Sequence, residues 1–519
     1  MQSYRLTIDG FLDHAAKWWG EREVVTADSG RVGYAALRAR SNRLSGALTK
    51  LGLQFGERVG TLAWNTQHHL EIYYAAMGAG FVCHTLNPRL TVTHLSAMVN
   101  EAEDRVLAVG AGLSGLASEL LRHCPSIRAV VVLDGDPPDT GAFGGRQTFG
   151  LEHLLSELGA ATLWGDFPEE SPSGLCYTSG TTGSPRGVLY THRSSYLHTL
   201  RALQADAIAL TAADAALVAV PMFHANAWGF PFAAPAVGAK LVLTGRHTDG
   251  ARLAALIRKE GVTVAAGVQT VWQGLLDYLD GEGGDVPSLE RVIIGGAPCP
   301  DSLIQRMETR LRARVQTSWG MTELSPLGTI APPRGSARAV ASGRPPVGLD
   351  LKLTDAAGTT LPQQRNMTGH LKVKGASVVD RYFGAEASAL DGEGYFDTGD
   401  LATIDDQGNL TIAGRTKDLI KSGGEWINPG EIESLIGRLP GVGQVAVIGQ
   451  VDPKWGERPV LVVEPQKGHT LDDQVLLGAL RSKVPEWWIP DRVIQVSSMP
   501  LSVTGKIDKV RLRAQFAGT

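Results

Sequence analysis

Residues 177–188 read Tyr-Thr-Ser-Gly-Thr-Thr-Gly-Ser-Pro-Arg-Gly-Val and follow the short apolar run Gly-Leu-Cys. Three glycines and five Ser/Thr hydroxyls fall within the ten positions from Thr178 to Gly187. Glycines let backbone N–H groups approach an anion closely, and hydroxyls add donors that turn toward phosphate oxygens. The next residues, Val-Leu-Tyr-Thr-His-Arg-Ser, indicate a strand and the start of a helix. The stretch therefore predicts a phosphate-binding loop rather than a flexible surface linker.

This loop differs from the phosphate loop of kinases and P-loop ATPases. Those proteins carry the pattern G-x-x-x-x-G-K-[ST], in which a lysine follows the last glycine directly. Here the basic residue is Arg186, and it follows a proline. The sequence thus disfavours a kinase or a P-loop ATPase.

Outward from the loop, the chain changes its pattern three times. From Tyr34 to about Gly135 helical segments alternate with short apolar runs, and this alternation resumes after Ser173. Such alternation is typical of parallel βαβ units. The stretch 135–150 is rich in Gly, Asp and Pro, so we expect an exposed loop there. After about Gly343, strands joined by turns, with Gln407-Gly408 as a hairpin signal, predict an antiparallel subdomain. The last hundred residues predict a compact α+β unit.

The expected fold is therefore α/β, with a large N-terminal domain of βαβ-type sheets that contains an antiparallel subdomain. A small, mobile α+β C-terminal domain completes the chain. At 519 residues the length also predicts more than one domain.

Composition excludes several classes of protein. With 43% apolar and 20% charged residues the chain is an ordinary globular one, and its net charge of −4 gives no drive toward nucleic acid. Four scattered cysteines without a C-x-x-C pair argue against a disulfide framework or a zinc site and favour a reducing compartment. The N-terminus lacks the apolar core of a signal peptide, and polar residues and prolines interrupt the apolar region 215–243. We expect a cytoplasmic protein without integral membrane association.

Six further motifs follow the loop. They are Pro221–His224, Gly295–Pro298, Trp319–Glu323, Tyr395–Asp400, Gly414–Asp418 and Pro500–Lys506. In this order they resemble the adenylate-forming superfamily of acyl-CoA synthetases, amino-acid adenylation domains and firefly-type luciferases. The resemblance covers essentially the whole chain, although Arg186 stands where the family usually has lysine. It implies an N-terminal adenylation domain (1–414), a hinge (415–417) and a mobile C-terminal domain (418–519) with the catalytic lysine.

The resemblance implies that a carboxylate attacks the α-phosphorus of ATP. Because two anions must meet and charge builds on the phosphoryl oxygens, positioning and cationic stabilisation should dominate catalysis. The family places the lysine that corresponds to Lys506 between the carboxylate and the α-phosphate. Glu323 is a carboxylate suited to Mg²⁺, and Thr178 stands near the metal in relatives. The implied catalytic group is Lys506, Thr322, Glu323 and His224.

The nucleotide site implied by the resemblance has three parts. The phosphates face Thr178, Ser179, Gly180, Thr181, Thr182 and Gly183. Adenine lies between the loop that contains Gly296, Ala297 and Pro298 and the segment Ser318, Trp319, Gly320, Met321 and Thr322. Asp400 accepts the ribose hydroxyls, and Arg415 is the second ribose contact. Trp319 replaces the tyrosine of many relatives and would stack on adenine equally well.

The candidate acyl pocket is largely uncharged. Its walls are His224, Trp228, Gln269, Trp272 and Gly295, although Trp228 and Trp272 are equally plausible as core aromatics. Amino-acid-activating relatives hold the substrate ammonium with an aspartate where this chain has His224, so an amino-acid substrate is disfavoured. The motifs most resemble those of medium-chain fatty acyl-CoA and 3-methylmercaptopropionyl-CoA ligases. The predicted acid has an uncharged aliphatic, thioether or aryl tail.

In the second half-reaction, coenzyme A would attack the adenylate after the C-terminal domain rotates. Lys417 occupies the hinge position, while Gly423, Gly424 and Trp426 would line the pantetheine tunnel and Lys421 would touch a phosphate. The expected partners are ATP, Mg²⁺, coenzyme A, a carboxylic acid and a second copy of the chain in a homodimer. The alternative is an enzyme that loads the thiol of a carrier protein. A luciferase-like oxygenase finds no support in the sequence, and a catalytically dead nucleotide sensor would be expected to lack Lys506 or Glu323.

Overall fold

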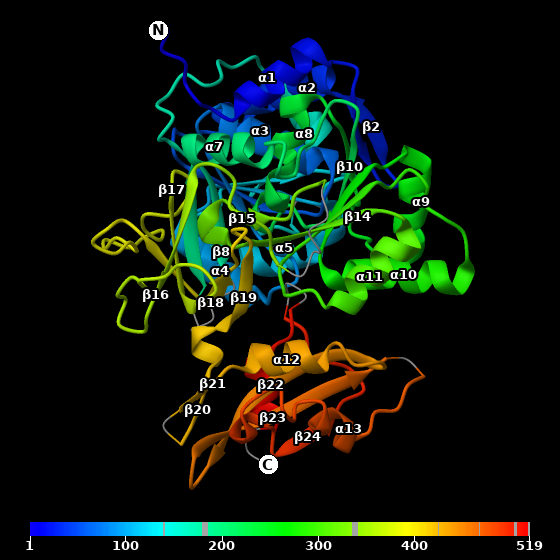
Figure 1. Cartoon of the computed structure of the whole chain (residues 1–519). Helices are drawn as coiled ribbons and strands as arrows, with labels where there is room; N and C mark the ends of the chain where they lie inside the picture. Colours follow the sequence, from blue (N-terminus) through cyan, green and yellow to red (C-terminus); the bar gives the residue numbers. More distant parts are fainter. Residues whose placement is uncertain are drawn as a thin grey trace.

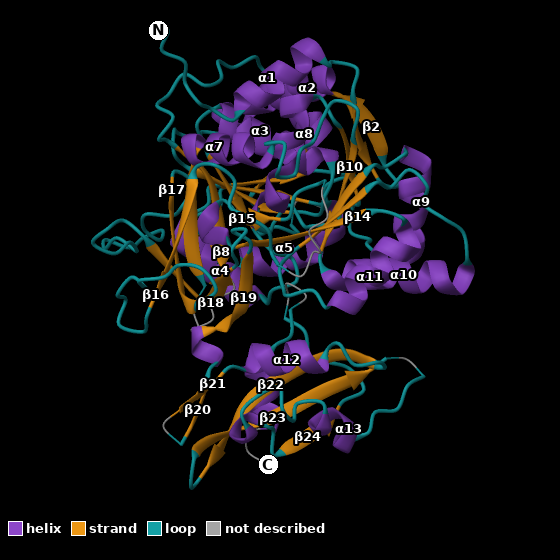
Figure 2. Ribbon diagram, in the orientation of Figure 1, coloured by secondary structure: helices purple, strands orange, loops and turns teal. Residues whose placement is uncertain are grey.

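The computed structural model describes residues 1–138, 141–178, 185–334, 341–423, 425–466, 468–502 and 506–516. Two large sheets form the N-terminal domain, a smaller antiparallel sheet lies beside them, and the C-terminal domain lies below (Figures 1 and 2). This arrangement confirms the predicted fold class.

The first large sheet has eight strands in the described part of the chain, in the order β15-β14-β13-β12-β10-β11-β1-β2. Its central strands run parallel, while β2 and β15 pair antiparallel at the two edges. The strands are β1 (Glu23–Thr26), β2 (Gly30–Gly33), β10 (Ala215–Val218), β11 (Lys240–Leu243), β12 (Val264–Gly267), β13 (Arg291–Ile294), β14 (Arg314–Gly320) and β15 (Leu327–Ile330).

The second large sheet has, within the described ranges, seven strands in the order β7-β6-β5-β3-β4-β8-β9. All pairs are parallel except the β8–β9 hairpin that borders the phosphate loop. The strands are β3 (Arg58–Leu62), β4 (Val82–Thr85), β5 (Val106–Val109), β6 (Ala129–Val132), β7 (Gln147–Gly150), β8 (Pro172–Thr178) and β9 (Arg186–Thr191). The segment 135–150, expected as a loop, therefore ends in an edge strand, because its last four residues continue the parallel ladder of β6.

Helices fill the space between the sheets and cover their outer faces. One apolar core joins residues of both sheets with helices α1, α2, α3 and α8, and α3 contacts strands of each sheet. Helices α9 to α11 cover the first sheet, and α4 and α5 cover the second. The helices of this domain are α1 (Asp9–Trp18), α2 (Tyr34–Lys50), α3 (Gln67–Gly78), α4 (Val92–Ala102), α5 (Ser114–Leu121), α6 (Leu151–Glu157), α7 (His192–Ala202), α8 (Phe230–Val237), α9 (Gly250–Glu260), α10 (Gln269–Glu282) and α11 (Asp301–Leu311).

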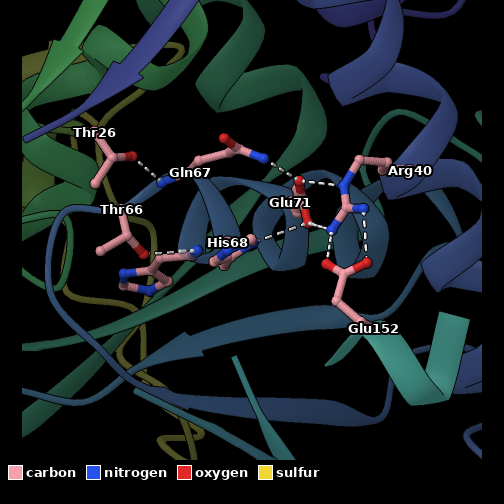
Figure 3. A network of polar contacts seen from close by, with 8 residues as sticks. Thr26, Arg40, Thr66, Gln67, His68, Glu71 and Glu152 are labelled. Carbon is pink, nitrogen blue, oxygen red and sulfur yellow. Dashed lines mark hydrogen bonds and ion pairs between the residues drawn. The ribbon is translucent and has the colours of Figure 1, made fainter. Parts of the chain in front are cut away.

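Helix α3 is held between the sheets by a buried polar network (Figure 3). Glu71 is fully buried and receives two hydrogen bonds from the Arg40 guanidinium, at 2.8 and 3.1 Å. Gln67 donates to the same carboxylate at 2.9 Å, and Arg40 also pairs with Glu152 of α6. The network joins α2, α3 and α6, so a single buried carboxylate fixes the packing of three helices.

The antiparallel subdomain contains four strands among the described residues, β16 (Leu349–Thr354), β17 (Thr368–Gly375), β18 (Phe396–Ile404) and β19 (Leu410–Arg415). The predicted hairpin at Gln407-Gly408 joins β18 to β19. Gly408 has a φ of 86°, and its N–H donates to Asp405 O at 2.9 Å. Glycine suits this turn because it adopts positive φ without steric cost.

The C-terminal domain is a twisted sheet with helices on it (Figure 1). It follows the one-turn helix η4 (Thr416–Asp418). Its strands are β20 (Ile420–Ser422), β21 (Glu425–Ile427), β22 (Val442–Asp452), β23 (Gly456–Pro465) and β24 (Arg492–Gln495), and its helices are α12 (Pro429–Ile436), α13 (Asp473–Gly478) and α14 (Lys509–Phe516). Across the described part of the chain, no helix is long and apolar enough to cross a membrane.

Candidate active site

The site lies where three elements of the N-terminal domain end near the C-terminal domain. Trp319, at the end of β14, donates its indole N–H to Asp400 Oδ2 at 2.9 Å. Arg415, at the end of β19, places Nε 2.8 Å from Asp400 Oδ1. Asp400 on β18 is 2% exposed, so its carboxylate is fixed by two donors from different strands. The structure thus brings together the predicted adenine residue and both predicted ribose residues.

Opposing influences act on the pKa of Asp400. Burial raises the pKa of this carboxyl above its usual range, and the Arg415 guanidinium, the Trp319 N–H and the Lys506 ammonium oppose that rise. Hydrogen bonds to a charged acceptor are among the strong ones in proteins. The arrangement is suited to accept hydrogen bonds from a diol.

Lys506 reaches this cleft from the C-terminal domain. A Cβ placed on Gly296 would lie 3.9 Å from Lys506 Cε, so the lysine side chain passes the loop after β13. Lys506 is itself an exposed residue. Burial and the Arg415 charge lower the pKa of Lys506, while Asp400 and Glu323 act in the opposite direction. A cation from the C-terminal domain therefore lies near the residues of the N-terminal domain that are predicted to bind the nucleotide.

Glu323 occupies the one-turn helix η3 (Thr322–Leu324) that follows β14. The residue is 7% exposed, and its Oε1 accepts a hydrogen bond from the Tyr382 hydroxyl at 2.9 Å. Burial raises the pKa of Glu323. Thr322 lies beside it, and Tyr190 donates to the Thr322 carbonyl at 2.9 Å.

The carboxylate oxygens of Glu323 are the kind of ligand that Mg²⁺ takes. Mg²⁺ in nucleotide sites usually takes one or two carboxylates, phosphate oxygens and water rather than a complete protein cage. Among the described residues, no group of three or more His, Cys, Asp or Glu side chains is arranged to hold a metal ion. Thr178, the other predicted metal neighbour, ends β8 and pairs with Arg186 across the hairpin.

Only the two ends of the phosphate loop belong to the described residues. Thr178 and Arg186 form its base, whereas Ser179, Gly180, Thr181, Thr182 and Gly183 lie outside the described part, as does Gly424. The Arg186 guanidinium lies 5.1 Å from the centroid of the Tyr382 ring.

Glycines at the end of β13 and β14 are required by close packing. A Cβ on Gly295 would lie 2.6 Å from Ser318 Oγ and 3.2 Å from Trp228 Cη2, and one on Gly320 would lie 2.2 Å from Pro326 O. The contact at Gly320 is with backbone and is too short for any side chain, while a side chain at position 295 would displace the Ser318 hydroxyl. Gly295, Ser318 and Trp228 therefore lie close together.

The other acyl-pocket candidates take different positions. His224 is partly exposed, and burial together with the Lys506 charge lowers its pKa to about 4, so the imidazole is neutral near pH 7. Gln269 lies at the entrance of α10 and donates its side-chain amide to Pro298 O, next to Ala297 in the predicted adenine loop. Trp272 is fully buried in the core beneath α9 to α11, and its indole N–H donates to Gly267 O at 3.1 Å. This position agrees with the alternative interpretation of Trp272 as a core aromatic.

Residues 225–229, which follow His224, form an unusual left-handed turn. Ala225, Asn226, Ala227 and Trp228 have φ between 43° and 57°, and Gly229 has 83°. Such conformations are costly for residues with a Cβ and persist where the surroundings enforce them. The turn directs Trp228 against Gly295. The sequence shows no sign of this strain, because the first four residues of the turn are not glycines, the residue type that marks positive φ.

The predicted thioester residues lie elsewhere. Lys421 and Trp426 face each other across the β20–β21 hairpin, 5.5 Å from ammonium to ring centroid, and Trp426 is 53% exposed. Gly423 has a φ of 60°, and its N–H donates to Trp455 O at 2.7 Å. Lys417 lies in η4, between the two domains. The structure therefore groups Lys506 with the nucleotide residues and holds this hairpin on the C-terminal sheet (Figure 1).

Tyr382 was missed by reasoning from the sequence. It lies 59 residues from Glu323 along the chain, outside every motif that suggested the site. The aromatic pair at 382–383 gives no local signal of a contact with a carboxylate in another subdomain.

Comparison with known proteins confirms the predicted resemblance. The family described as AMP-binding enzyme matches residues 12–383, and its C-terminal domain matches residues 431–506. The 3-methylmercaptopropionyl-CoA ligase of Ruegeria lacuscaerulensis is 42% identical over 99% of this chain and 98% of its own. The medium-chain-fatty-acid–CoA ligase of Ectopseudomonas oleovorans is 41% identical over 99% and 97%.

Solved structures share the fold over the whole chain. An anthranilate CoA ligase in complex with anthranoyl-AMP superposes with a TM-score of 0.89 at 22% identity, covering 99% of this chain and 98% of that one. ATP-bound MatB from Rhodopseudomonas palustris gives 0.85 at 26% identity, covering 98% and 99%. Because the family models match residues 12–383 and 431–506 and the relatives match almost the whole chain, the chain belongs to the AMP-binding enzyme family.

Proposed function

We propose that the protein is an AMP-forming acyl-CoA ligase. It activates a carboxylic acid with ATP as acyl-AMP, releases pyrophosphate, and transfers the acyl group to coenzyme A. One observation carries the proposal: Lys506 of the C-terminal domain lies in the same cleft as Asp400, Arg415 and Glu323 of the N-terminal domain. The relatives named above support it: both are CoA ligases, and both match this chain over almost their full length.

In the first half-reaction a carboxylate oxygen bonds to the α-phosphorus as the bond to the pyrophosphate oxygen breaks. Asp400 and Arg415 hold the ribose, and Trp319 stacks on adenine opposite Gly296, so the α-phosphate faces Lys506. The ammonium neutralises charge on both approaching anions. Mg²⁺ held by Glu323, with Thr178 nearby, would neutralise the departing phosphates.

The acid carries an uncharged tail. His224 is neutral, Trp228 and Gly295 form an apolar wall, and the lowered pKa of His224 leaves it unable to pair with a charged tail near pH 7. The relatives' names point to medium-chain fatty acids and to 3-methylmercaptopropionate. We infer a medium-chain fatty, thioether or aryl acid, with His224, Trp228, Gln269 and Gly295 around it.

The second half-reaction requires a domain rotation about Lys417. The boundaries are 1–414, 415–417 and 418–519. Rotation would remove Lys506 from the cleft and bring the β20–β21 hairpin with Gly423 and Trp426 toward the adenylate. There the coenzyme A thiolate attacks the acyl carbon and AMP leaves. We further propose a cytoplasmic homodimer, for which light scattering of the purified protein is the test; all four cysteines are free thiols, as a reducing compartment requires.

The experiment is pyrophosphate release with ATP and Mg²⁺ over a panel of short, medium and long fatty acids, aryl acids and 3-methylmercaptopropionate. Each acid is assayed with and without coenzyme A. Turnover that depends on coenzyme A and is confined to a narrow set of acids establishes the ligase and its substrate class. Pyrophosphate release that coenzyme A does not accelerate would instead point to a carrier-protein thiol as acceptor.

A further inference from the structure

Tyr382 contacts two parts of the nucleotide site at once. Its hydroxyl donates to Glu323 Oε1 at 2.9 Å, while the Arg186 guanidinium stacks 5.1 Å from its ring centroid. Arg186 is the first residue of β9, directly after the phosphate loop. One side chain from the antiparallel subdomain therefore bridges the base of the loop and the buried carboxylate.

The segment that carries Tyr382 also holds the main chain of Glu323. Val379 N–H donates to Glu323 O at 2.8 Å, and Phe383 N–H donates to Gly187 O at 2.7 Å. These two bonds fix the segment against η3 on one side and against β9 on the other. The backbone on both sides of Tyr382 is therefore held by hydrogen bonds, which fixes the position of its hydroxyl relative to Glu323.

Two donors hold the carboxylate of Glu323, the Tyr382 hydroxyl at Oε1 and the backbone N–H of Glu323 itself. The Tyr382 hydroxyl is the donor that comes from another part of the chain, so it ties the rotation of the carboxylate to the antiparallel subdomain. Hydrogen bonds to charged groups are strong enough to favour one orientation of a short side chain. Glu323 is 7% exposed, so water has little access to replace the phenol.

The cation over the ring of Tyr382 is an arginine, and a lysine would interact with the ring differently. A guanidinium is planar and stacks on an aromatic face, whereas an ammonium is a compact and strongly hydrated point charge. Arg186 thus covers the ring of Tyr382 in a way that the lysine usual at this position in the family would not. The stack links the charge at the loop end to the orientation of Glu323.

We propose that Tyr382 is a positioning residue that orients Glu323 toward the metal–nucleotide complex, and that the Arg186 stack holds Tyr382 in place. The inference rests on the proposed function, because it takes Glu323 as the carboxylate that holds Mg²⁺. Tyr382 acts through Glu323 and touches no reacting atom itself.

The test compares Tyr382→Phe with a matched control, Tyr395→Phe. Tyr395 lies in the same subdomain and makes the same pattern of contacts, with its hydroxyl 2.5 Å from Asp350 Oδ2 and Lys352 Nζ 3.9 Å from its ring centroid. In both variants the ring that loses its hydrogen bond to a carboxylate has a cation over one face, a guanidinium at Tyr382 and an ammonium at Tyr395. They differ in whether that carboxylate belongs to the site.

Tyr382→Phe should raise the Mg²⁺ concentration for half-maximal pyrophosphate release about tenfold, the lower end of a charged hydrogen bond. Binding of α,β-methylene ATP with Mg²⁺, measured by calorimetry, should weaken by a similar factor, while KM for the acid changes less than about twofold. Tyr395→Phe should match the wild type in all three quantities. Arg186→Lys should show part of the Tyr382→Phe defect, because it retains the charge but loses the stack.

Two results would overturn the inference. One is an unchanged Mg²⁺ requirement and unchanged analogue affinity in Tyr382→Phe. The other is an equal defect in both tyrosine variants, which would indicate a general loss of subdomain stability. Neither result is confused with failure of the proposed function, since that failure appears as absence of acid-dependent pyrophosphate release by the wild-type enzyme.

Discussion

Two buried histidines on α7 make this protein sensitive to acid. Ile8 N–H donates to His192 Nδ1 at 3.2 Å, and Leu327 N–H donates to His198 Nε2 at 3.0 Å. Each of these ring nitrogens must carry a lone pair, so both imidazoles are neutral in the folded protein. Burial lowers the pKa of His192 to about 3 and that of His198 well below its usual value.

The sign and size of the effect follow from proton linkage. In the unfolded chain a histidine titrates near pH 6.5, so below that pH the unfolded state binds protons that the folded state refuses. Stability is therefore full above about pH 7 and falls as the pH drops from about 6.5 toward the folded-state pKa. Between pH 7 and pH 5 each such histidine costs about 2 kcal/mol, or about 4 kcal/mol for the pair.

The assay is the free energy of unfolding in urea between pH 7 and pH 5 for the wild type, His198→Gln and His192→Asn. The glutamine oxygen reaches the position of Nε2 and the asparagine oxygen that of Nδ1, so each variant keeps an acceptor that cannot be protonated. Each should remove about 2 kcal/mol of the loss between the two pH values. His123→Gln, at an exposed site, is the control. A pH dependence that both α7 variants leave unchanged would refute the reasoning.

Three further predictions concern the site and its scaffold. Glu71→Gln should lower the free energy of unfolding by about 3 kcal/mol, because it leaves the Arg40 guanidinium without its buried charged partner; urea unfolding measures this. Trp319→Phe should raise KM for ATP about tenfold, since stacking is kept but the N–H on buried Asp400 is lost, and an unchanged KM in ATP titrations would contradict it. Lys506→Ala should reduce adenylate formation at least about 100-fold and spare thioester formation from supplied acyl-AMP, whereas Lys417→Pro should show the opposite bias in the same two half-reaction assays.

The sequence predicted the fold well where periodicity is local. Fully buried apolar runs such as Ala129–Val132 and alternating helices identified parallel strands, and Gln407-Gly408 identified a hairpin. Sequence periodicity could not predict that both large sheets share one core, nor that β1 pairs with β11 far along the chain. Residues 147–150 lack an apolar run, and they become a strand only because β6 offers them an open edge.

The candidate site also contains residues that the sequence could predict and contacts that it could not. The order of the motifs predicted Asp400, Arg415, Trp319 and Lys506, and the structure brings these residues into one cleft. Contacts that depend on packing between subdomains left no pattern in the sequence. Trp272 illustrates the limit, since an aromatic in a helix serves a core and a pocket equally well until the face of the helix is known.

Helix α7 contacts both the left-handed turn that follows His224 and the segment that follows Glu323. His198 bonds to Leu327 N, and a Cβ on Gly229 would lie 2.9 Å from its ring, so it touches both the turn after Glu323 and the left-handed turn after His224. Arg201, one helical turn on, donates to Leu324 O at 3.4 Å, to Leu327 O at 2.6 Å and to Ser377 Oγ at 2.7 Å. Burial lowers the pKa of Arg201 to about 10; its two terminal nitrogens donate to carbonyl and hydroxyl oxygens, whereas the buried Nε has no hydrogen-bond partner among the described residues. These oxygens belong to η3, β15 and the antiparallel subdomain, so α7 packs at the same time against the left-handed turn after His224 and against the segment after Glu323.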